Sequence, residues 1–271
     1  MSEQPTLKLN DDRQIPQLGF GTWRITDDEA PGIVSQALEV GYWLIDTAAI
    51  YRNEGGVGRG IGEWSDIFLQ TKVWNDSQGY ERAKRAFANS LQRLNRSFVD
   101  MLLIHWPCPA KNSYLDTWKA MVELREEGLA HSIGVSNFRP QDLERLVSET
   151  GVTPAINQIE LHPHFQQREL RQLHDDMGIV TQSWSPLGKG RAFDSDAVRS
   201  VAQETGQPAG AVIVRWHIQH GLSTLPKAAS RQHMEQNFAA LNFELTEEQM
   251  ARIDELDDAN GRIGEHPDEV N

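Results

Sequence analysis

The sequence predicts an α/β fold, a (β/α)8 TIM barrel, from its hydrophobic pattern and its length. Short apolar runs with the character of strands alternate with longer amphipathic segments, about eight times along the 271 residues. Such alternation indicates parallel strands joined by helical crossovers, and eight units in about 250 residues is the usual size of this barrel. A doubly wound open sheet shares the alternation and stays an alternative here. No low-complexity linker divides the chain, so we expect a single domain over residues 1–271.

The expected strands are apolar runs, with turn-forming residues between them. Ahead of the first strand, residues 7–12 and 14–16 predict a short N-terminal hairpin, which would cap the bottom of the barrel. Residues 260–271 have little periodicity, and we expect an extended tail there. The strands are expected at residues 18–21, 43–46, 67–72, 101–105, 132–135, 155–158, 179–183 and 222–225.

Helical spacing fills the intervals between these strands. Asp27 and Asp28 can cap a helix that Gly41 ends, and Pro208 suits the start of a later helix. The glycine-rich run at residues 55–60 lacks the G-x-G-x-x-G spacing of a dinucleotide loop. We interpret it as a helix start that needs close packing. Apolar residues recur at steps of three and four through residues 83–94, 170–177 and 198–205.

The composition argues against several classes of protein. A net charge of -13 would repel the phosphate backbone of a nucleic acid. The one cysteine, Cys108, can form no internal disulfide and no cysteine zinc site, as is common in a reducing compartment. The sequence has no secretory signal pattern and no run of the roughly 18 apolar residues that a membrane span needs. We therefore expect a cytoplasmic protein that binds neither nucleic acid nor membrane.

Polar side chains stand at the carboxyl ends of three consecutive expected strands. Asp46, Lys72 and His105 each follow an apolar run, and Tyr51 lies five residues beyond Asp46. In a barrel of this kind the active site lies at the carboxyl ends of the strands. Each residue alone has a purely structural explanation, such as a turn cap, a solvent-facing lysine or a hydrogen-bonded core histidine. Their shared position predicts a catalytic group.

Together, these four side chains could provide a general acid with an adjusted pKa and a hydrogen bond to a substrate carbonyl. A tyrosine hydroxyl has a pKa of about 10 and is a poor acid near neutrality. A cation alongside, here Lys72, is expected to lower that pKa, and Asp46 can keep Lys72 charged and oriented. His105 can hydrogen-bond a substrate oxygen. The set predicts a tuned general acid, Tyr51, beside a polarised carbonyl.

At these positions the chain resembles the aldo-keto reductase family over nearly its whole length. Within the family it is similar to the bacterial 2,5-diketo-D-gluconate reductases, especially at residues 74–76, 182–184 and 261–270. The resemblance implies reduction of a small ketone or aldehyde, such as 2,5-diketo-D-gluconate, by NADPH. It is carried by ordered motifs at residues 18–23, 41–54, 71–75, 105–107, 133–138, 157–163 and 183–188.

The resemblance also implies a role for each matching residue. Tyr51 would donate the proton, Lys72 and Asp46 would tune it, and His105 would orient the carbonyl. Trp184 would stack on the nicotinamide ring. The other implied contacts are Ser136, Asn137 and Gln158 to the carboxamide, Ser185, Leu187 and Gly188 near the pyrophosphate, Lys227, His233 and Asn237 at the adenosine end, and Trp23, Trp74 and Trp106 around the substrate.

The segment after the eighth strand departs from the family pattern at the adenosine phosphate. Lys227 and Asn237 match, but Ala228 stands where a hydroxyl is usual, and His233 replaces an arginine. A histidine is mostly neutral at pH 7, whereas an arginine is a permanent bidentate donor. Arg231 could compensate. We expect that NADPH is used but that discrimination against NADH is weak.

Two other classes of function remain open on the sequence alone. One is a non-catalytic nucleotide-binding barrel subunit, which would need no tuned tyrosine. The other is a metal-dependent barrel enzyme, for which His162 and His164 are the nearest candidates, although no third ligand is evident. We expect no metal and a monomer. The sequence does not indicate the physiological substrate.

Overall fold

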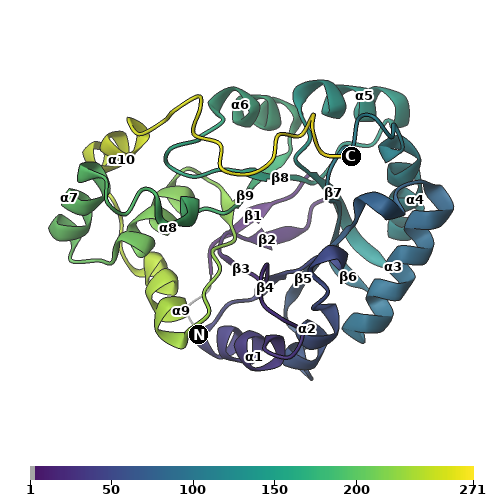
Figure 1. Cartoon of the computed structure of the whole chain (residues 1–271), viewed down its shortest axis with the longest axis horizontal. Coiled ribbons are helices and arrows are strands. Elements are labelled where there is room, and N and C mark those ends of the chain that lie inside the picture. The colour runs from purple at the N-terminus through teal and green to yellow at the C-terminus, as the bar shows by residue number, and fades with distance from the viewer. Residues whose placement is uncertain (1–3) are drawn as a thin grey trace.

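A computed structural model describes residues 4–271, and its core is one parallel sheet ringed by helices (Figure 1). The strands pair in chain order, and a parallel bridge from Leu18 to Thr224 joins the two outer edges. The predicted (β/α)8 barrel is confirmed, and the open sheet is excluded. The strands are β3 (Gly19–Gly21), β4 (Leu44–Asp46), β5 (Phe68–Val73), β6 (Val99–Ile104), β7 (Ala130–Ser136), β8 (Ile156–Glu160), β9 (Val180–Trp184) and β10 (Ser223–Thr224).

The helices cover the outside of the sheet, and their apolar faces pack against outward-facing strand residues such as Ile45, Leu102 and Val135. The three helical segments predicted from periodicity fall within α3, α6 and α7, and Pro208 directly precedes α8. The helices are α1 (Ala30–Val40), α2 (Glu54–Ile61), α3 (Tyr80–Leu94), α4 (Tyr114–Glu126), α5 (Pro140–Thr150), α6 (Arg168–Met177), α7 (Asp196–Thr205), α8 (Ala209–Gln219), α9 (Arg231–Phe238) and α10 (Glu247–Asp254).

The prediction that Asp27 or Asp28 caps the first helix is wrong, because no side chain among residues 4–271 caps the start of that helix. Helix α1 begins after Glu29 and ends at Gly41, which has the expected left-handed φ of 118°. Asp27 instead accepts a hydrogen bond of 2.6 Å from the Gly56 amide, in the first turn of α2. Its carboxylate also pairs with Arg59 at 2.7 Å. The aspartate therefore caps a neighbouring helix, because tertiary packing brings that helix within reach of a charged partner as well.

The glycine-rich run lies inside α2, at the contact of that helix with its neighbours. A Cβ on Gly56 would lie 2.2 Å from the Asp27 carbonyl oxygen, and one on Gly58 would lie 2.3 Å from the Leu94 carbonyl oxygen. Both distances are too short for any side chain. The interpretation of this run as a packing feature is confirmed.

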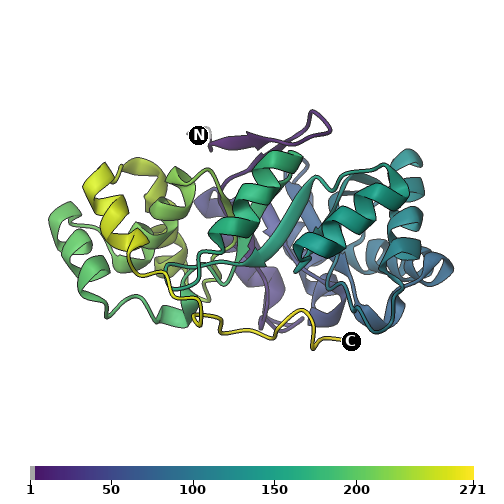
Figure 2. The same cartoon turned by 90° about the horizontal axis from the view of Figure 1, so that it is seen from above.

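The lower interior of the barrel is apolar and is closed by the hairpin. Strands β1 (Thr6–Lys8) and β2 (Gln14–Pro16) pair antiparallel. Leu9 and Ile15 of the hairpin segment join inward-facing strand residues in one buried cluster with Leu44, Met101, Leu103, Ile156 and Leu225. Figure 2 shows the hairpin, in purple, on one face of the barrel and the carboxyl-terminal tail, in yellow, on the opposite face.

The upper interior of the barrel, at the carboxyl ends of the strands, is polar. Side chains alternate along each strand, so Gln70 and Lys72 of β5 point inward like Asp46 of β4. Gln158 and Gln182 are register partners on β8 and β9 at the same level. These buried polar groups form the floor of the site described below. No helix within residues 4–271 has both the length and the apolar character that a membrane crossing requires.

Candidate active site

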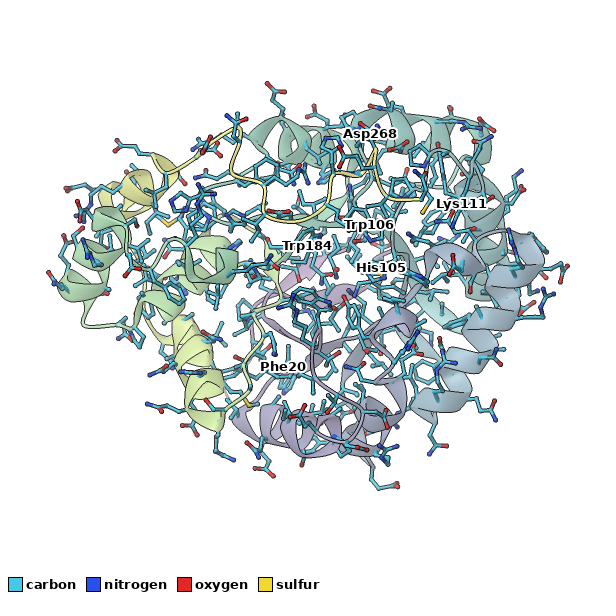
Figure 3. All side chains as sticks on the ribbon, in the orientation of Figure 1. Phe20, His105, Trp106, Lys111, Trp184 and Asp268 are labelled. Atoms are coloured by element: carbon cyan, nitrogen blue, oxygen red, sulfur yellow. The ribbon has the colours of Figure 1, made fainter. Side chains whose placement is uncertain are left out.

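The four residues predicted at strand ends come together at the upper rim of the barrel. Asp46 is the last residue of β4, Lys72 is the next-to-last residue of β5, and His105 directly follows β6. Tyr51 ends a short 3-10 turn, Ala49–Tyr51, that follows β4. Figure 3 shows His105 near the middle of the barrel mouth, between the helices that surround it.

Lys72 and Asp46 form a buried ion pair. Lys72 Nζ lies 2.5 Å from Asp46 Oδ1 and also donates to the Thr47 carbonyl at 2.9 Å. The lysine side chain is 0% exposed and the aspartate side chain 6%. Burial lowers the pKa of Lys72, and the adjacent Asp46 carboxylate opposes that effect. The pair is therefore what keeps a cation at this position.

Tyr51 lies over this ion pair with its ring close to the cation. Lys72 Nζ is 5.2 Å from the centre of the Tyr51 ring, and the His105 ring stands edge-on at 5.7 Å. Burial raises the pKa of Tyr51 well above 10, and the Asp46 charge adds to the effect. This corrects the expectation that Lys72 lowers the pKa. The charge of Lys72 is largely offset by Asp46 at 2.5 Å, so burial dominates the pKa of the neutral phenol.

His105 is neutral in this environment. Burial lowers its pKa well below 6.5, and the nearby Lys72 charge lowers it further. Its Nδ1 is buried without a hydrogen-bond partner, so Nε2 is the nitrogen left to contact a substrate. Trp74 stands edge-on to the ring at 5.1 Å. A neutral imidazole with its proton on Nε2 can donate to a substrate oxygen.

Two glutamines that the sequence analysis missed support the aspartate. Gln70 Nε2 donates to Asp46 Oδ1 at 2.6 Å and to Gln182 Oε1 at 2.8 Å. Gln182 in turn donates to Ser223 at 3.1 Å. A usable signal was present, because Gln70 stands two residues before Lys72 and so faces the same side of the strand. A glutamine within a buried apolar run needs a partner, and here that partner is the active-site carboxylate.

The residues expected at the nicotinamide carboxamide lie beside this group and bond to one another. Asn137 donates to the His105 carbonyl and to Ser136 Oγ, both at 3.0 Å, and accepts from Trp184 Nε1 at 2.8 Å. Gln158 Nε2 donates to Asp46 at 3.1 Å and to Gln182 at 2.7 Å. Gln158 Oε1 accepts no hydrogen bond from residues 4–271, so it is an acceptor that suits an amide donor such as a carboxamide. This arrangement fits the implied cofactor.

The segment after β9 makes a tight loop at the same rim. Ser185 and Gly188 both have left-handed backbone, with φ of 49° and 54°. The Gly188 amide donates back to the Ser185 carbonyl at 2.8 Å, with Pro186 and Leu187 between them. Successive backbone amides in such a turn can form a concave site for anions. The loop therefore suits the pyrophosphate contact that the resemblance implies.

The residues expected at the adenosine end follow β10. Lys227 is exposed, and no carboxylate in the described part of the chain forms an ion pair with it. The Ser230 side chain caps α9 by accepting from the His233 amide at 3.3 Å, and Asn237 lies buried further along the helix. Arg231 pairs instead with Glu39 at 2.8 Å and with Glu235 at 2.9 Å. Its charge is thus already balanced, which weakens the compensation expected of it.

The three tryptophans expected around the substrate lie on the same rim. Trp74 contacts His105, and Trp106 follows it in the chain and is 9% exposed. Trp23 is 43% exposed and stacks under Arg24 at 4.3 Å. Figure 3 shows Trp106 and Trp184 beside His105 at the mouth. Of the three, Trp74 is the one in direct ring contact with His105.

His162, one of the two histidines considered as metal ligands, has another partner. His162 Nε2 lies 3.1 Å from Glu160, and both side chains are fully buried. Residues 4–271 contain no group of three or more histidine, cysteine, aspartate or glutamate side chains that could hold a metal ion. Glu160, the partner of His162, also accepts hydrogen bonds from the backbone of the carboxyl-terminal tail.

Comparison with known proteins identifies the family. The sequence profile of the Aldo/keto reductase family matches residues 17–258. The chain is 45% identical to an aldo-keto reductase of Mycobacterium sp. (strain JLS), and 42% identical to methylglyoxal reductase DkgA of Escherichia coli (strain K12). These alignments cover 98% of both chains in the first case and 99% of both in the second.

Solved structures agree with this assignment. The crystal structure of Gox0644 in its apo form has a TM-score of 0.98 at 42% identity, with 100% of both chains covered. An aspartate-to-alanine variant of Gox0644 was crystallised in complex with NADPH. An aldo/keto reductase from Brucella melitensis has a TM-score of 0.91 at 47% identity, with 94% of this chain and 100% of that chain covered. The chain belongs to the aldo/keto reductase family.

Proposed function

We propose that the chain reduces a small ketone or aldehyde to the alcohol, with Tyr51 as the proton donor and NADPH as the reductant. The observation that carries the proposal is the meeting of Tyr51, His105 and the buried Lys72–Asp46 ion pair at one rim. A site that only bound a nucleotide would need no tyrosine held over a buried cation. The family membership supports the same reaction.

Each of the four residues has a separate role in one proton transfer. His105 is neutral and donates a hydrogen bond from Nε2 to the substrate oxygen, which polarises the carbonyl. Bound NADPH supplies the hydride. Burial raises the pKa of Tyr51 above 10, so the phenol is protonated at neutral pH and can pass its proton to the developing alkoxide. Lys72 stabilises the phenolate that remains, and Asp46 keeps Lys72 charged and oriented.

The cofactor assignment rests on the fit of the rim residues and on relatives. Gln158 Oε1, Ser136 and Asn137 would hold the carboxamide. Trp184 is held by the hydrogen bond from its Nε1 to Asn137 and would stack on the nicotinamide ring. Gox0644, at 42% identity, was crystallised with NADPH. Lys227 would meet the adenosine phosphate.

We further propose that the preference for NADPH over NADH is weak. His233 is exposed and carries no permanent charge, and Arg231 is neutralised by Glu39 and Glu235. Steady-state kinetics with each cofactor decide the matter. The ratio of the two kcat/KM values is expected to stay below about a thousandfold, which corresponds to roughly 4 kcal/mol. A larger ratio contradicts the proposal.

The substrate proposal is a small dicarbonyl or keto-sugar acid, in line with relatives named methylglyoxal reductase. A panel with NADPH should include methylglyoxal, 2,5-diketo-D-gluconate and simple ketones, and should follow absorbance at the nicotinamide band. Activity on at least one of them is expected. Replacing Tyr51→Phe keeps the ring and removes the proton, and kcat should fall more than a hundredfold. Activity within tenfold of the wild type would show that Tyr51 is not the acid. No reduction of any substrate by the wild type would favour the non-catalytic alternative.

A further inference from the structure

The carboxyl-terminal strap, residues 261–271, crosses the mouth of the barrel without helix or strand structure (Figure 1, yellow). Several loops at the rim hold it. Lys189 Nζ donates to the Ile263 carbonyl at 3.3 Å, and Arg139 forms an ion pair with Asp268. At the far end, the Ala110 amide donates to Asn271 Oδ1 at 3.0 Å. The strap is thus tied to the loops that follow β6, β7 and β9.

Its strongest attachment is a buried carboxylate at the end of β8. Glu160 accepts from the Ile263 amide at 2.6 Å through Oε1 and from the Gly264 amide at 2.9 Å through Oε2. The His162 ring lies 3.1 Å from Oε1, and the Arg262 guanidinium lies 4.0 Å from Oε2. The Glu160 side chain is 0% exposed. A carboxylate held by two backbone amides is a strong, charge-assisted contact.

Glu160 is ionised in this setting. Burial acts to raise the pKa of its carboxyl. The hydrogen bonds from His162 and from the Ile263 and Gly264 amides outweigh burial and leave the pKa below its ordinary value. The carboxylate therefore keeps both oxygens as acceptors at neutral pH, which the two amides of the strap require.

The strap is held directly against Trp184. Glu160 and Trp184 are register partners at the ends of β8 and β9. A Cβ on Gly264 would lie 2.4 Å from Trp184 Cη2 and 2.8 Å from Glu160 Oε2. The backbone of Gly264 is therefore packed between the indole and the carboxylate, and only a glycine fits there. The other edge of the indole is fixed by Asn137.

We propose that Glu160 is a positioning residue that clamps the strap onto Trp184 and so holds one wall of the substrate pocket. The proposal rests on the proposed reductase function. Glu160 contacts the strap and takes no part in the proton transfer assigned to Tyr51. From Trp184 the strap continues towards Asp268, on the side of the mouth where Figure 3 shows Trp106 and Lys111. Loss of the clamp should therefore weaken substrate binding and leave the chemical step largely unchanged.

The clamp is tested first by hydrogen exchange of the strap amides in the full-length protein. Glu160→Gln keeps the shape of the side chain but removes one acceptor, so residues 262–266 should exchange at least tenfold faster than in the wild type. Glu169→Gln is the matched control, because Glu169 is exposed on α6 and forms no hydrogen bond or ion pair with the described residues of the strap. Unchanged exchange in Glu160→Gln would overturn the clamp.

The pocket role is tested by a double-variant cycle with Gly264→Ala, which displaces the strap from its own side. Each single variant should raise KM for the carbonyl substrate at least fivefold, with kcat within threefold of the wild type. If both act through the same contact, the double variant is no worse than the worse single variant. Multiplied effects on KM, or a fall in kcat with KM unchanged, would overturn the proposal. If the wild type reduces nothing, the reductase function fails, whereas the exchange experiment still decides the clamp.

Discussion

The buried ion pair of Lys72 and Asp46 makes a prediction that separates stability from catalysis. Three variants are compared with the wild type: Lys72→Met, Asp46→Asn and the double variant. Methionine keeps the length of the lysine stem without its charge, and asparagine keeps the shape of the aspartate and one oxygen acceptor. The two single variants break the pair, whereas the double variant removes both charges.

The magnitude follows from burial and from the partners that remain. Both side chains are almost fully buried, and removing one partner of such a pair destabilises a protein by about 3–5 kcal/mol. Lys72→Met leaves the carboxylate with donors from Gln70 and Gln158. Asp46→Asn leaves the buried ammonium with neutral acceptors only, the asparagine oxygen and the Thr47 carbonyl at 2.9 Å, so it should be the less stable of the two. The double variant carries no buried charge here and should come within about 2 kcal/mol of the wild type.

Two assays on the same samples measure stability and catalytic activity. Urea unfolding at pH 7.5, followed by the fluorescence of the 8 tryptophans, gives the free energy of unfolding. Steady-state reduction of the best substrate gives kcat/KM. We expect the double variant to recover stability while all three variants lose at least a hundredfold in kcat/KM, because Tyr51 has lost its charged neighbour.

One pattern of results would refute this reasoning. If the double variant is destabilised by the sum of the two single variants, the charges are not coupled and the ion pair has no special role in stability. If the double variant keeps activity within tenfold of the wild type, Lys72 and Asp46 do not act on the proton transfer.

Three further predictions test the packing, the cofactor site and the buried histidines. Gly56→Ala should destabilise the protein by about 1–3 kcal/mol or more, whereas Gly32→Ala, in open space on α1, should be neutral or stabilising; equal unfolding midpoints would contradict this. His233→Arg should raise the kcat/KM ratio of NADPH to NADH about tenfold, or about 1.4 kcal/mol, and an unchanged ratio would show that His233 does not meet the phosphate. Burial lowers the pKa of His174 to about 4 and that of His217 to about 3, so the unfolded state takes up protons first. Stability should therefore fall as the pH drops below about 6.5, by up to ~1.4 kcal/mol per histidine per pH unit. Urea unfolding from pH 7.5 to 5 measures this, and an unaltered slope in the variant lacking both histidines would refute it.

The strands were predictable because a parallel strand buried on both faces reads as a short apolar run. For the same reason their carboxyl ends were visible, and Asp46, Lys72 and His105 could be placed at one rim. Gln70 and Gln182 were overlooked inside such runs, although a buried amide usually makes at least one hydrogen bond. The cap at Asp27 was misplaced, since local spacing does not show that Gly56 of another helix lies 2.6 Å away.

By itself, the sequence determined the barrel, the kinds of side chain at its rim and the resemblance that suggested their roles. These follow from periodicity and from order along the chain. Only the tertiary structure decided the electrostatics: the phenol of Tyr51 is made less acidic by burial, because Asp46 balances the charge of Lys72. It likewise placed Glu160 under the strap, 103 residues away in sequence from Ile263. The pKa of Tyr51 and the attachment of the strap both depend on groups that lie within a few ångströms of one another in the fold. Contacts between segments far apart in the chain leave no local pattern in the sequence.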